Sequence, residues 1–247
     1  GDADVGVRMA AATALAGVPW RGRRDALASL LDDADLGVAS MAAQGLAHAK
    51  DARGAGLLVE VTGERRLRFD ALEALFVLDH ESASEVAAGF FRGFFVPPFE
   101  KGIAALVLAR RGDEKARAHV LERLSRPRAE ERPMLLVHAL AALGPSGVEV
   151  VEGVAADEGD YLRESALLAL VRRDSAVWPR VQAALARWVD DDPHVSAELL
   201  MGLFDIDASR AGLLVEAHAG REDDLGRAAR RLRLAGSLRA RFPGEIP

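Results

Sequence analysis

The sequence contains no cysteine and only three lysines. Without cysteine the chain has no disulfide framework, no thiolate nucleophile and no sulfur ligands for a metal, and its compartment stays open, with the cytoplasm favoured. No apolar run approaches the roughly eighteen residues that a membrane-spanning helix needs, and the first residues lack the layout of a signal peptide. We therefore expect no membrane span.

Positive charge is not concentrated along most of the chain. The formal net charge is −6, and both halves mix acidic and basic residues. Binding to DNA or RNA depends on a basic surface that neutralises phosphates, so the composition predicts no nucleic-acid partner. A group of arginines near the C-terminus indicates either a solvated helix face or a surface for an acidic partner. It comprises Arg227, Arg230, Arg231, Arg233, Arg239 and Arg241.

Histidine is present but is never paired at the spacing of a metal site. The six residues are His48, His80, His119, His138, His194 and His218. None forms the His-x-x-x-His pair that places two ligands on one helix face. Asp79, Glu81 and Glu85 could serve as acid and base, but carboxylates near a helix start usually cap it. We predict no catalytic, metal-binding or cofactor-binding residue, and therefore no enzyme.

One pattern recurs along the chain. It is clearest in Leu162-Arg163-x-x-Ala166-x-x-Ala169-Leu170. Close copies begin at Val7, Val38 and Leu67, and looser ones surround Leu106, Leu143, Leu203 and Ala229. The copies lie about thirty residues apart, which is the period of a helical solenoid in which each repeat contacts only its neighbours.

Each repeat is predicted to hold an outer helix, a short turn and an inner helix that carries the pattern. The predicted pairs occupy residues 24–31 and 36–47, 54–61 and 67–78, 84–95 and 99–109, 114–124 and 133–143, 147–155 and 161–171, 178–189 and 193–204, and 209–217 and 225–234. The first copy has no partner helix before it, so we expect a piece of a longer protein. We predict an all-α solenoid of about eight antiparallel helix pairs, the first truncated, in a single domain over residues 1–247.

Two features of the pattern have a direct physical basis. Positions i, i+4, i+7 and i+8 share a helix face, and small residues among them let neighbouring helices approach closely. Aspartates before the inner helices can accept hydrogen bonds from free amide groups at the helix start. We predict such caps, in preference to an acidic binding ridge, at Asp4, Asp35, Asp160, Asp192 and Asp224.

Aspartate at the turn, then Val-Arg and Ala-x-x-Ala-Leu on the second helix, resembles the HEAT repeat, in particular its short bacterial form, over nearly the whole chain. The resemblance implies a curved array with a concave inner surface and a scaffold that holds other proteins. The motif arginine is present only at Arg8, Arg68 and Arg163, so no continuous ladder of aspartate–arginine pairs is expected. HEAT-like deoxyhypusine hydroxylases hold iron with several His-Glu pairs, whereas His80-Glu81 is a single pair.

The inner helices are also apolar on the face opposite the pattern. A helix that is apolar all round is normally buried, so these side chains either pack against one another or form an exposed apolar groove. On the groove hypothesis, the chain is a non-catalytic scaffold that binds a protein or peptide partner and needs no cofactor. The anchors would be Phe69, Leu72, Phe76, Ile103, Leu140, Leu168, Met201 and Phe204.

Two HEAT-like classes are the alternatives. DNA glycosylases of this architecture need a basic, aromatic-lined face, and phycobilin lyases need an apolar trough for a tetrapyrrole. No residue of this sequence singles out either one.

Residues 89–99 hold five of the nine phenylalanines. We predict that these side chains fill the space left by Gly89 and Gly93 instead of forming an exposed aromatic patch. Trp20, Trp178 and Trp188 are predicted to be partly buried packing residues.

Overall fold

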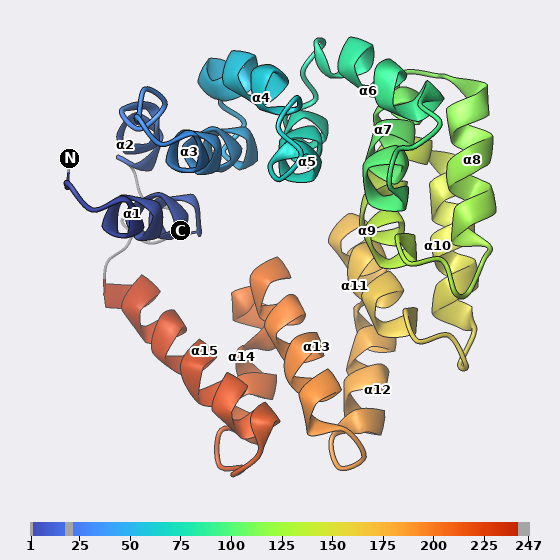
Figure 1. The fold of residues 1–247 in the computed structure, drawn as a ribbon. Coiled ribbons are helices and arrows are strands. Elements are labelled where there is room, and N and C mark those ends of the chain that lie inside the picture. Colours follow the sequence, from blue (N-terminus) through green and yellow to red (C-terminus); the bar gives the residue numbers. More distant parts are fainter. Residues whose placement is uncertain (1, 18–21, 242–247) are drawn as a thin grey trace. The chain divides into compact units, whose positions relative to one another are not determined.

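The computed structural model describes residues 2–17 and 22–241, and it describes side chains up to residue 237. Within these residues the regular elements are helices, and no strand occurs (Figure 1). Within each of the two units described below, consecutive α-helices pack against one another. The predicted all-α, solenoid-like fold is therefore confirmed. The chain divides into two compact units, unit 1 (Gly1–Leu143) and unit 2 (Gly144–Pro247), and the single array over residues 1–247 stays a prediction.

Unit 1 is built on an inner row of helices, α1, α3, α5, α7 and α9, in which each contacts the next. Helices α2, α4, α6 and α8 cover this row from the other side. The elements are α1 (Val5–Gly17), α2 (Arg23–Ala28), α3 (Leu36–His48), the 3₁₀ helix η1 (Ala52–Gly54), α4 (Ala55–Val61), α5 (Arg68–Leu78), α6 (Ala83–Arg92), α7 (Pro98–Arg110), α8 (Glu114–Leu124) and α9 (Arg132–Leu143).

Unit 2 repeats this plan with α11, α13 and α15 as the inner row. Helices α10, α12 and α14 pack on these three. The elements are α10 (Pro145–Ala156), α11 (Arg163–Arg173), the 3₁₀ helix η2 (Ser175–Val177), α12 (Trp178–Trp188), α13 (Pro193–Ile206), α14 (Ala208–His218) and α15 (Asp224–Arg241). None of the helices in the described part of the chain is both long and apolar enough to cross a membrane.

Aspartate side chains cap three inner helices as predicted. The Oδ1 atom of Asp4 accepts from Gly6 N at 2.6 Å, and that of Asp35 accepts from Val38 N at 3.1 Å. Asp192 accepts in the same way from the backbone amides of His194 and Val195. Each bond satisfies an amide that has no partner inside the helix. The predicted cap at Asp160 is wrong, because its side chain accepts from Leu162 N, which precedes α11.

The predicted cap at Asp224 is wrong by one residue. Asp224 is the first residue of α15 and pairs with Arg227. The cap is Asp223, whose Oδ1 accepts from Gly226 N at 3.0 Å. Arg221 holds Asp223 in place, because its Nε donates to Oδ2 at 2.8 Å.

Small residues set the distance between inner helices. A Cβ atom placed on Gly45 would lie 2.9 Å from Ala16 Cβ and 3.0 Å from Leu27 Cδ1. A Cβ atom on Gly202 would lie 2.7 Å from Leu168 Cδ2. At Gly45 the neighbours include Ala16 Cα at 3.2 Å, so alanine there would require a shift between α3 and α1, whereas at Gly202 the Leu168 side chain would have to rotate away.

The inner helices α3, α5, α7 and α13 each contact two row neighbours and outer helices, so side chains on both of their sides are buried. In α7 the whole run from Gly102 to Ala109 is buried. The tight-packing interpretation of the doubly apolar helices is correct for a large group of side chains. These are Leu72, Phe76, Ile103, Val107, Leu167, Val171, Leu200 and Phe204.

The prediction that the phenylalanine stretch fills internal space is wrong for three of its five phenylalanines, Phe94, Phe95 and Phe99, which are exposed. Helix α6 ends at Arg92, and Gly93 follows in an extended conformation. Val96 turns back against Gly93, so close that a Cβ there would lie 2.6 Å from Val96 Cγ2. The turn leaves Phe94 97 % and Phe95 101 % exposed.

The tryptophans and the motif arginines have local packing roles. Trp178 is buried and Trp188 is half-buried, as predicted, whereas Trp20 and the side chains of Arg239 and Arg241 lie outside the described residues. The motif arginines have different kinds of partner. Arg8 pairs with Asp33, Arg68 donates to the carbonyls of Thr62 and Gly63, and Arg163 reaches Glu164.

Candidate functional site

The eight predicted anchors do not form one exposed surface. Leu72 and Ile103 are fully buried, and Phe76 and Phe204 are at most 5 % exposed. The half-buried residues are Phe69, Leu140 and Leu168. Met201 is exposed. Half of the set is therefore buried in the core of its own unit.

Polar groups cover Phe76, the central predicted anchor of unit 1. The guanidinium carbon of Arg110 lies 4.7 Å from the ring centroid of Phe76. The ring of His138 meets the same ring at a centroid distance of 5.0 Å and an interplanar angle of 69°. The predicted apolar surface is therefore charged at this point.

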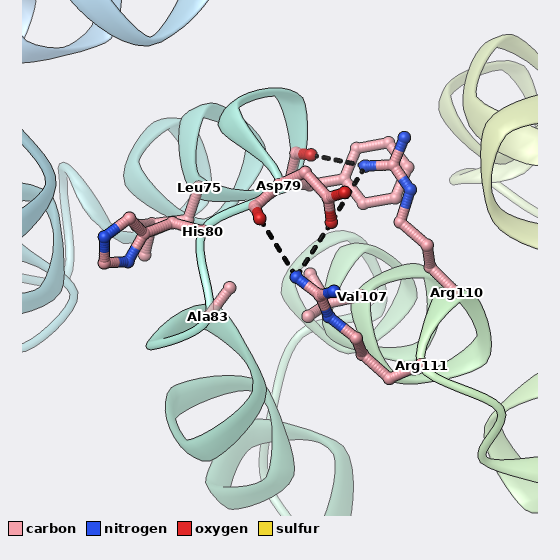
Figure 2. A pocket seen from close by; sticks show the side chains of 8 residues that line it. Leu75, Asp79, His80, Ala83, Val107, Arg110 and Arg111 are labelled. Atoms are coloured by element: carbon pink, nitrogen blue, oxygen red, sulfur yellow. Dashed lines mark hydrogen bonds and ion pairs between the residues drawn. The ribbon is translucent and has the colours of Figure 1, made fainter. Parts of the chain in front are cut away.

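Two arginines converge on one carboxylate at the end of α5 (Figure 2). Arg111 Nη2 lies 2.8 Å from Asp79 Oδ1 and donates to the Asp79 carbonyl oxygen at 3.0 Å. Arg110 Nη1 donates to the carbonyl oxygen of Phe76 at 2.8 Å and lies 3.6 Å from Asp79 Oδ1. Asp79 itself is left-handed, with φ 60°, and ends α5, so it is not the helix-start cap that the sequence suggested.

This cluster stabilises the C-terminal end of α5. The last carbonyls of a helix lack intrahelical donors and carry partial negative charge, which favours nearby cations. Arg110 and Arg111 supply such cations, and Lys50 donates to the carbonyl of Val77. The depression among these side chains has an empty volume of about 150 Å³ including its open mouth, with no room for a water-sized sphere. We therefore assign the cluster a structural role.

A hydrogen bond joins α5 to α9, the inner helices on either side of α7. His138 Nε2 lies 2.9 Å from Glu73 Oε1. This hydrogen bond lowers the pKa of Glu73, although partial burial acts in the opposite direction. In Asp70, on the same helix, burial raises the pKa of the carboxyl group.

The other candidate chemical groups do not gather. His80 Nδ1 lies 2.7 Å from the Oγ atom of its near neighbour Ser82, and the ring of His119 packs on Phe91. Burial lowers the pKa of His119. Across the residues with described coordinates, no group of three or more histidine or carboxylate side chains is arranged to hold a metal ion.

Unit 2 contains an open cleft between α14 and α15, with Phe204 of α13 among its lining residues. Its volume is about 350 Å³. We call it the α14–α15 cleft. It is lined by Phe204, Ala208, Gly212, Val215, Glu216, Leu232, Arg233, Gly236 and Ser237.

Missing side chains leave this cleft open. At Gly212, on α14, no neighbouring atom lies within 4 Å of the position that a Cβ would take. At Gly236, on α15, the nearest neighbouring atom is Phe204 Cζ at 3.8 Å. Both glycines lie inside helices, where glycine is about 1 kcal/mol less favourable than alanine, so their positions are not explained by helix formation.

The polar groups of the cleft are loosely held. Arg233 Nη1 lies 3.8 Å from Glu216 Oε2, and the two side chains are 54 % and 61 % exposed. That distance is too long for a hydrogen bond. The facing donor of Arg233 and acceptor of Glu216 are therefore not used by each other. Ser237 donates its hydroxyl hydrogen to the carbonyl of Leu234, which leaves the oxygen able to accept.

Sequence reasoning selected Phe204 but missed the cleft. The available signal was glycine within a predicted helix, at Gly212. Gly56 has the same neighbours in the sequence and lies exposed on α4, so this signal alone does not distinguish the two positions.

No protein-family model matches the sequence, and a search of curated proteins finds no match either. Among solved structures, the chain is similar to human deoxyhypusine hydroxylase in complex with glycerol. The identity is 19 % and the TM-score 0.38, over 93 % of this chain and 89 % of that chain. It is also similar to an engineered protein, with 18 % identity and a TM-score of 0.37, over 95 % of this chain and 75 % of that chain. Likeness at this level assigns no ligand, metal or reaction to the chain.

The prediction of a purely non-catalytic scaffold with an apolar groove is wrong. One of the solved structures that the chain is similar to is by its name a hydroxylase. The buried anchors give the physical reason in the chain itself, because Leu72, Phe76 and Ile103 are covered by its own atoms. The prediction that the chain is not an enzyme is without support.

Proposed function

We propose that the chain is a HEAT-like repeat protein of the short bacterial type that binds a small apolar ligand in the α14–α15 cleft. The observation that carries this proposal is the volume of about 350 Å³ between α14 and α15. Sites for small molecules usually measure about 300–1,000 Å³ and are mostly apolar, with a few polar groups that orient the ligand. The cleft meets both conditions.

The walls of the cleft suit a flat, apolar molecule. Leu232 is half-buried and offers aliphatic surface, whereas Phe204 and Val215 reach the cleft only with small exposed parts, 5 % and 2 % of each residue. Gly212 and Gly236 leave the space between the helices free. Because glycine positions on two helices form the space, binding orders few side chains and loses little conformational entropy.

The size of the cleft points to one or two fused rings. A tetrapyrrole is much larger, so this proposal differs from the phycobilin lyase alternative. A net charge of −6 gives no support to a nucleic-acid ligand, and its exclusion remains part of the proposal.

The test is calorimetric titration of the 247-residue chain with 2-naphthamide, a neutral bicyclic probe. We expect one binding site with a dissociation constant of about 0.1–1 mM, as suits a ligand of this size. In the variant Gly212→Leu the new side chain occupies the cleft, and we expect affinity to fall at least about tenfold.

The matched control is Gly56→Leu. Gly56 and Gly212 share the following residues Leu-Leu-Val-Glu, and neither has a neighbouring atom within 4 Å of the added Cβ. Both variants replace a helical glycine, so both should keep or raise stability, by up to about 1 kcal/mol. Equal binding by wild type and Gly212→Leu, or no binding by wild type, would reject the proposed function.

A further inference from the structure

The charged side chains at the rim of the α14–α15 cleft indicate which head group its ligand has. We infer that the ligand is a monocarboxylic acid with an apolar ring body, and that its carboxylate pairs with Arg233. This inference rests on the proposed function, because it concerns the ligand of the same cleft.

Arg233 is placed to receive a carboxylate. Its nearest acidic partner, Glu216 Oε2, is 3.8 Å from Nη1, beyond hydrogen-bond distance. A guanidinium presents five donors in a planar fork that matches the two oxygens of a carboxylate. A ligand carboxylate at the rim can therefore make the paired bonds that Glu216 does not make.

The surrounding charge favours an anion over a cation. Over its described side chains, α15 carries four arginines and one acidic residue, which is a net charge of +3 from 4 − 1. Arg227 is paired with Asp224, and Arg230 donates to the carbonyls of Ala219 and Arg221. Arg231 is exposed, and Arg233 is half-exposed with Glu216 Oε2 3.8 Å from its Nη1.

The competing head group is an amine, which would pair with Glu216. Glu216 is the one carboxylate among the described residues that line the cleft. Its helix, α14, carries Arg210 as well, so α14 has no net negative charge, with histidine neutral, to set against the +3 of α15. The electrostatic potential at the rim therefore favours an acid over an amine.

The apolar lining requires the rest of the ligand to be uncharged. Phe204, Val215 and Leu232 offer no hydrogen-bonding side chain, and a second charge placed among them would lose hydration without compensation. Dicarboxylates and phosphate esters therefore fit less well than a ring acid with a single charge at one end.

The experiment compares three probes of nearly equal shape on the full chain by calorimetry. These are 2-naphthoate, the neutral 2-naphthamide and the cationic 2-naphthylmethylamine. We expect wild type to bind 2-naphthoate about threefold to tenfold more tightly than 2-naphthamide, because an exposed charge-assisted pair is partly screened. The amine should bind more weakly than the amide.

Three variants locate the source of the preference. Arg233→Gln should bind the acid and the amide alike, and Glu216→Gln should increase the preference for the acid because it removes the competing carboxylate. Arg231→Gln is the matched control, since Arg231 is an exposed arginine of α15 that does not line the cleft. It should keep most of the preference.

Failure of this inference is distinguishable from failure of the proposed function. Equal binding of acid and amide by wild type, with both lost in Gly212→Leu, would overturn the carboxylate and leave the cleft as the site. Tighter binding of the amine would also overturn it, as would equal loss of preference in Arg231→Gln and Arg233→Gln. Absence of binding by all three probes would reject the cleft itself.

Discussion

Residues 51–60 and 207–216 share the sequence Asp-Ala-x-x-Ala-Gly-Leu-Leu-Val-Glu, yet they bury different faces. Both begin with a capping aspartate, which accepts from Arg53 N in the first segment and from Arg210 N in the second. In α4 the buried positions are 55, 58 and 61, whereas in α14 they are 211 and 215. Leu213 is 84 % exposed, while its counterpart Leu57 is half-buried.

The positions that differ between the two segments explain the change of face. Gly54 sits against α3 so closely that a Cβ would lie 2.8 Å from the Cα and Cβ of Ala43. Its counterpart Arg210 lies with its guanidinium 4.4 Å from the Trp178 ring centroid. An identical run of residues thus turns toward whichever neighbour is present, which is why the same glycine is simply exposed on α4 and lines a cleft on α14.

The largest expected contrast comes from the second leucine of the shared run. Leu58 is fully buried, so Leu58→Ala should lower the free energy of unfolding by about 3 kcal/mol. Leu214 is half-buried, and Leu214→Ala should cost about 1 kcal/mol. Urea unfolding followed by circular dichroism measures both, and equal losses would mean that the two helices bury the same face.

The next contrast concerns the residue that distinguishes the segments. Gly54→Ala forces backbone atoms of α3 and η1 apart and should lower the free energy of unfolding by about 1–3 kcal/mol. Arg210→Ala removes only an exposed cation–π contact and should cost less than about 1 kcal/mol. The same unfolding titration applies. A harmless Gly54→Ala would show that close approach to Ala43 does not orient α4.

A smaller contrast tests the first leucine of the run. Leu213→Gln should change the free energy of unfolding by no more than about 0.5 kcal/mol, because the side chain is already in solvent. Leu57→Gln should lower it by about 1 kcal/mol, since half of the apolar side chain is covered. A cost at Leu213 that matches the cost at Leu57 would contradict the rotated orientation of α14.

The smallest contrast concerns the two caps. The hydrogen bond from Arg53 lowers the pKa of Asp51, so the ionised carboxylate favours the folded state. Its stabilising effect is full above the unfolded pKa of about 3.9 and disappears as pH falls through the lower folded value. We expect Asp51→Asn to cost about 0.5 kcal/mol at pH 7 and progressively less below about pH 4.

Asp207→Asn is the control for that measurement. Ser209 stands where Arg53 follows Asp51, so the second cap has no arginine at the same offset. Stability measured by thermal unfolding across pH should show a smaller pH-dependent difference for this variant. An identical pH profile for the two variants would show that Arg53 does not set the behaviour of Asp51.

Much of the fold could be predicted because its determinants are local. The bounds of α8 match the predicted residues 114–124, where Asp113 caps the helix start. The end of α6 was missed because it depends on Gly93 meeting Val96, which no helical periodicity records. Burial on both sides of the inner helices was left open because it depends on how close neighbouring rows lie.

The candidate site was out of reach for a related reason. Phe204 was selected from its position on the inner face, but the cleft beside it is defined by a separation between α14 and α15. Gly56 and Gly212 have the same neighbours in sequence, and only their spatial surroundings differ. The surface around Phe76 was predicted to be apolar, but Arg110 and His138, which come from other helices, cover its ring.

Lys50 and Asp79 occupy left-handed backbone positions, with φ of 57° and 60°, where glycine is the usual choice. The left-handed conformation costs each residue about 1 kcal/mol relative to glycine. The side chain of each residue bonds to the next helix of the inner row. The hydrogen bond of Lys50 and the ion pair of Asp79 thereby join the C-terminal ends of α3, α5 and α7. If these three helices separate, we expect their N-terminal ends to separate first. Glycine in place of Lys50 or Asp79 would relax the backbone and remove the contact that joins the helix ends.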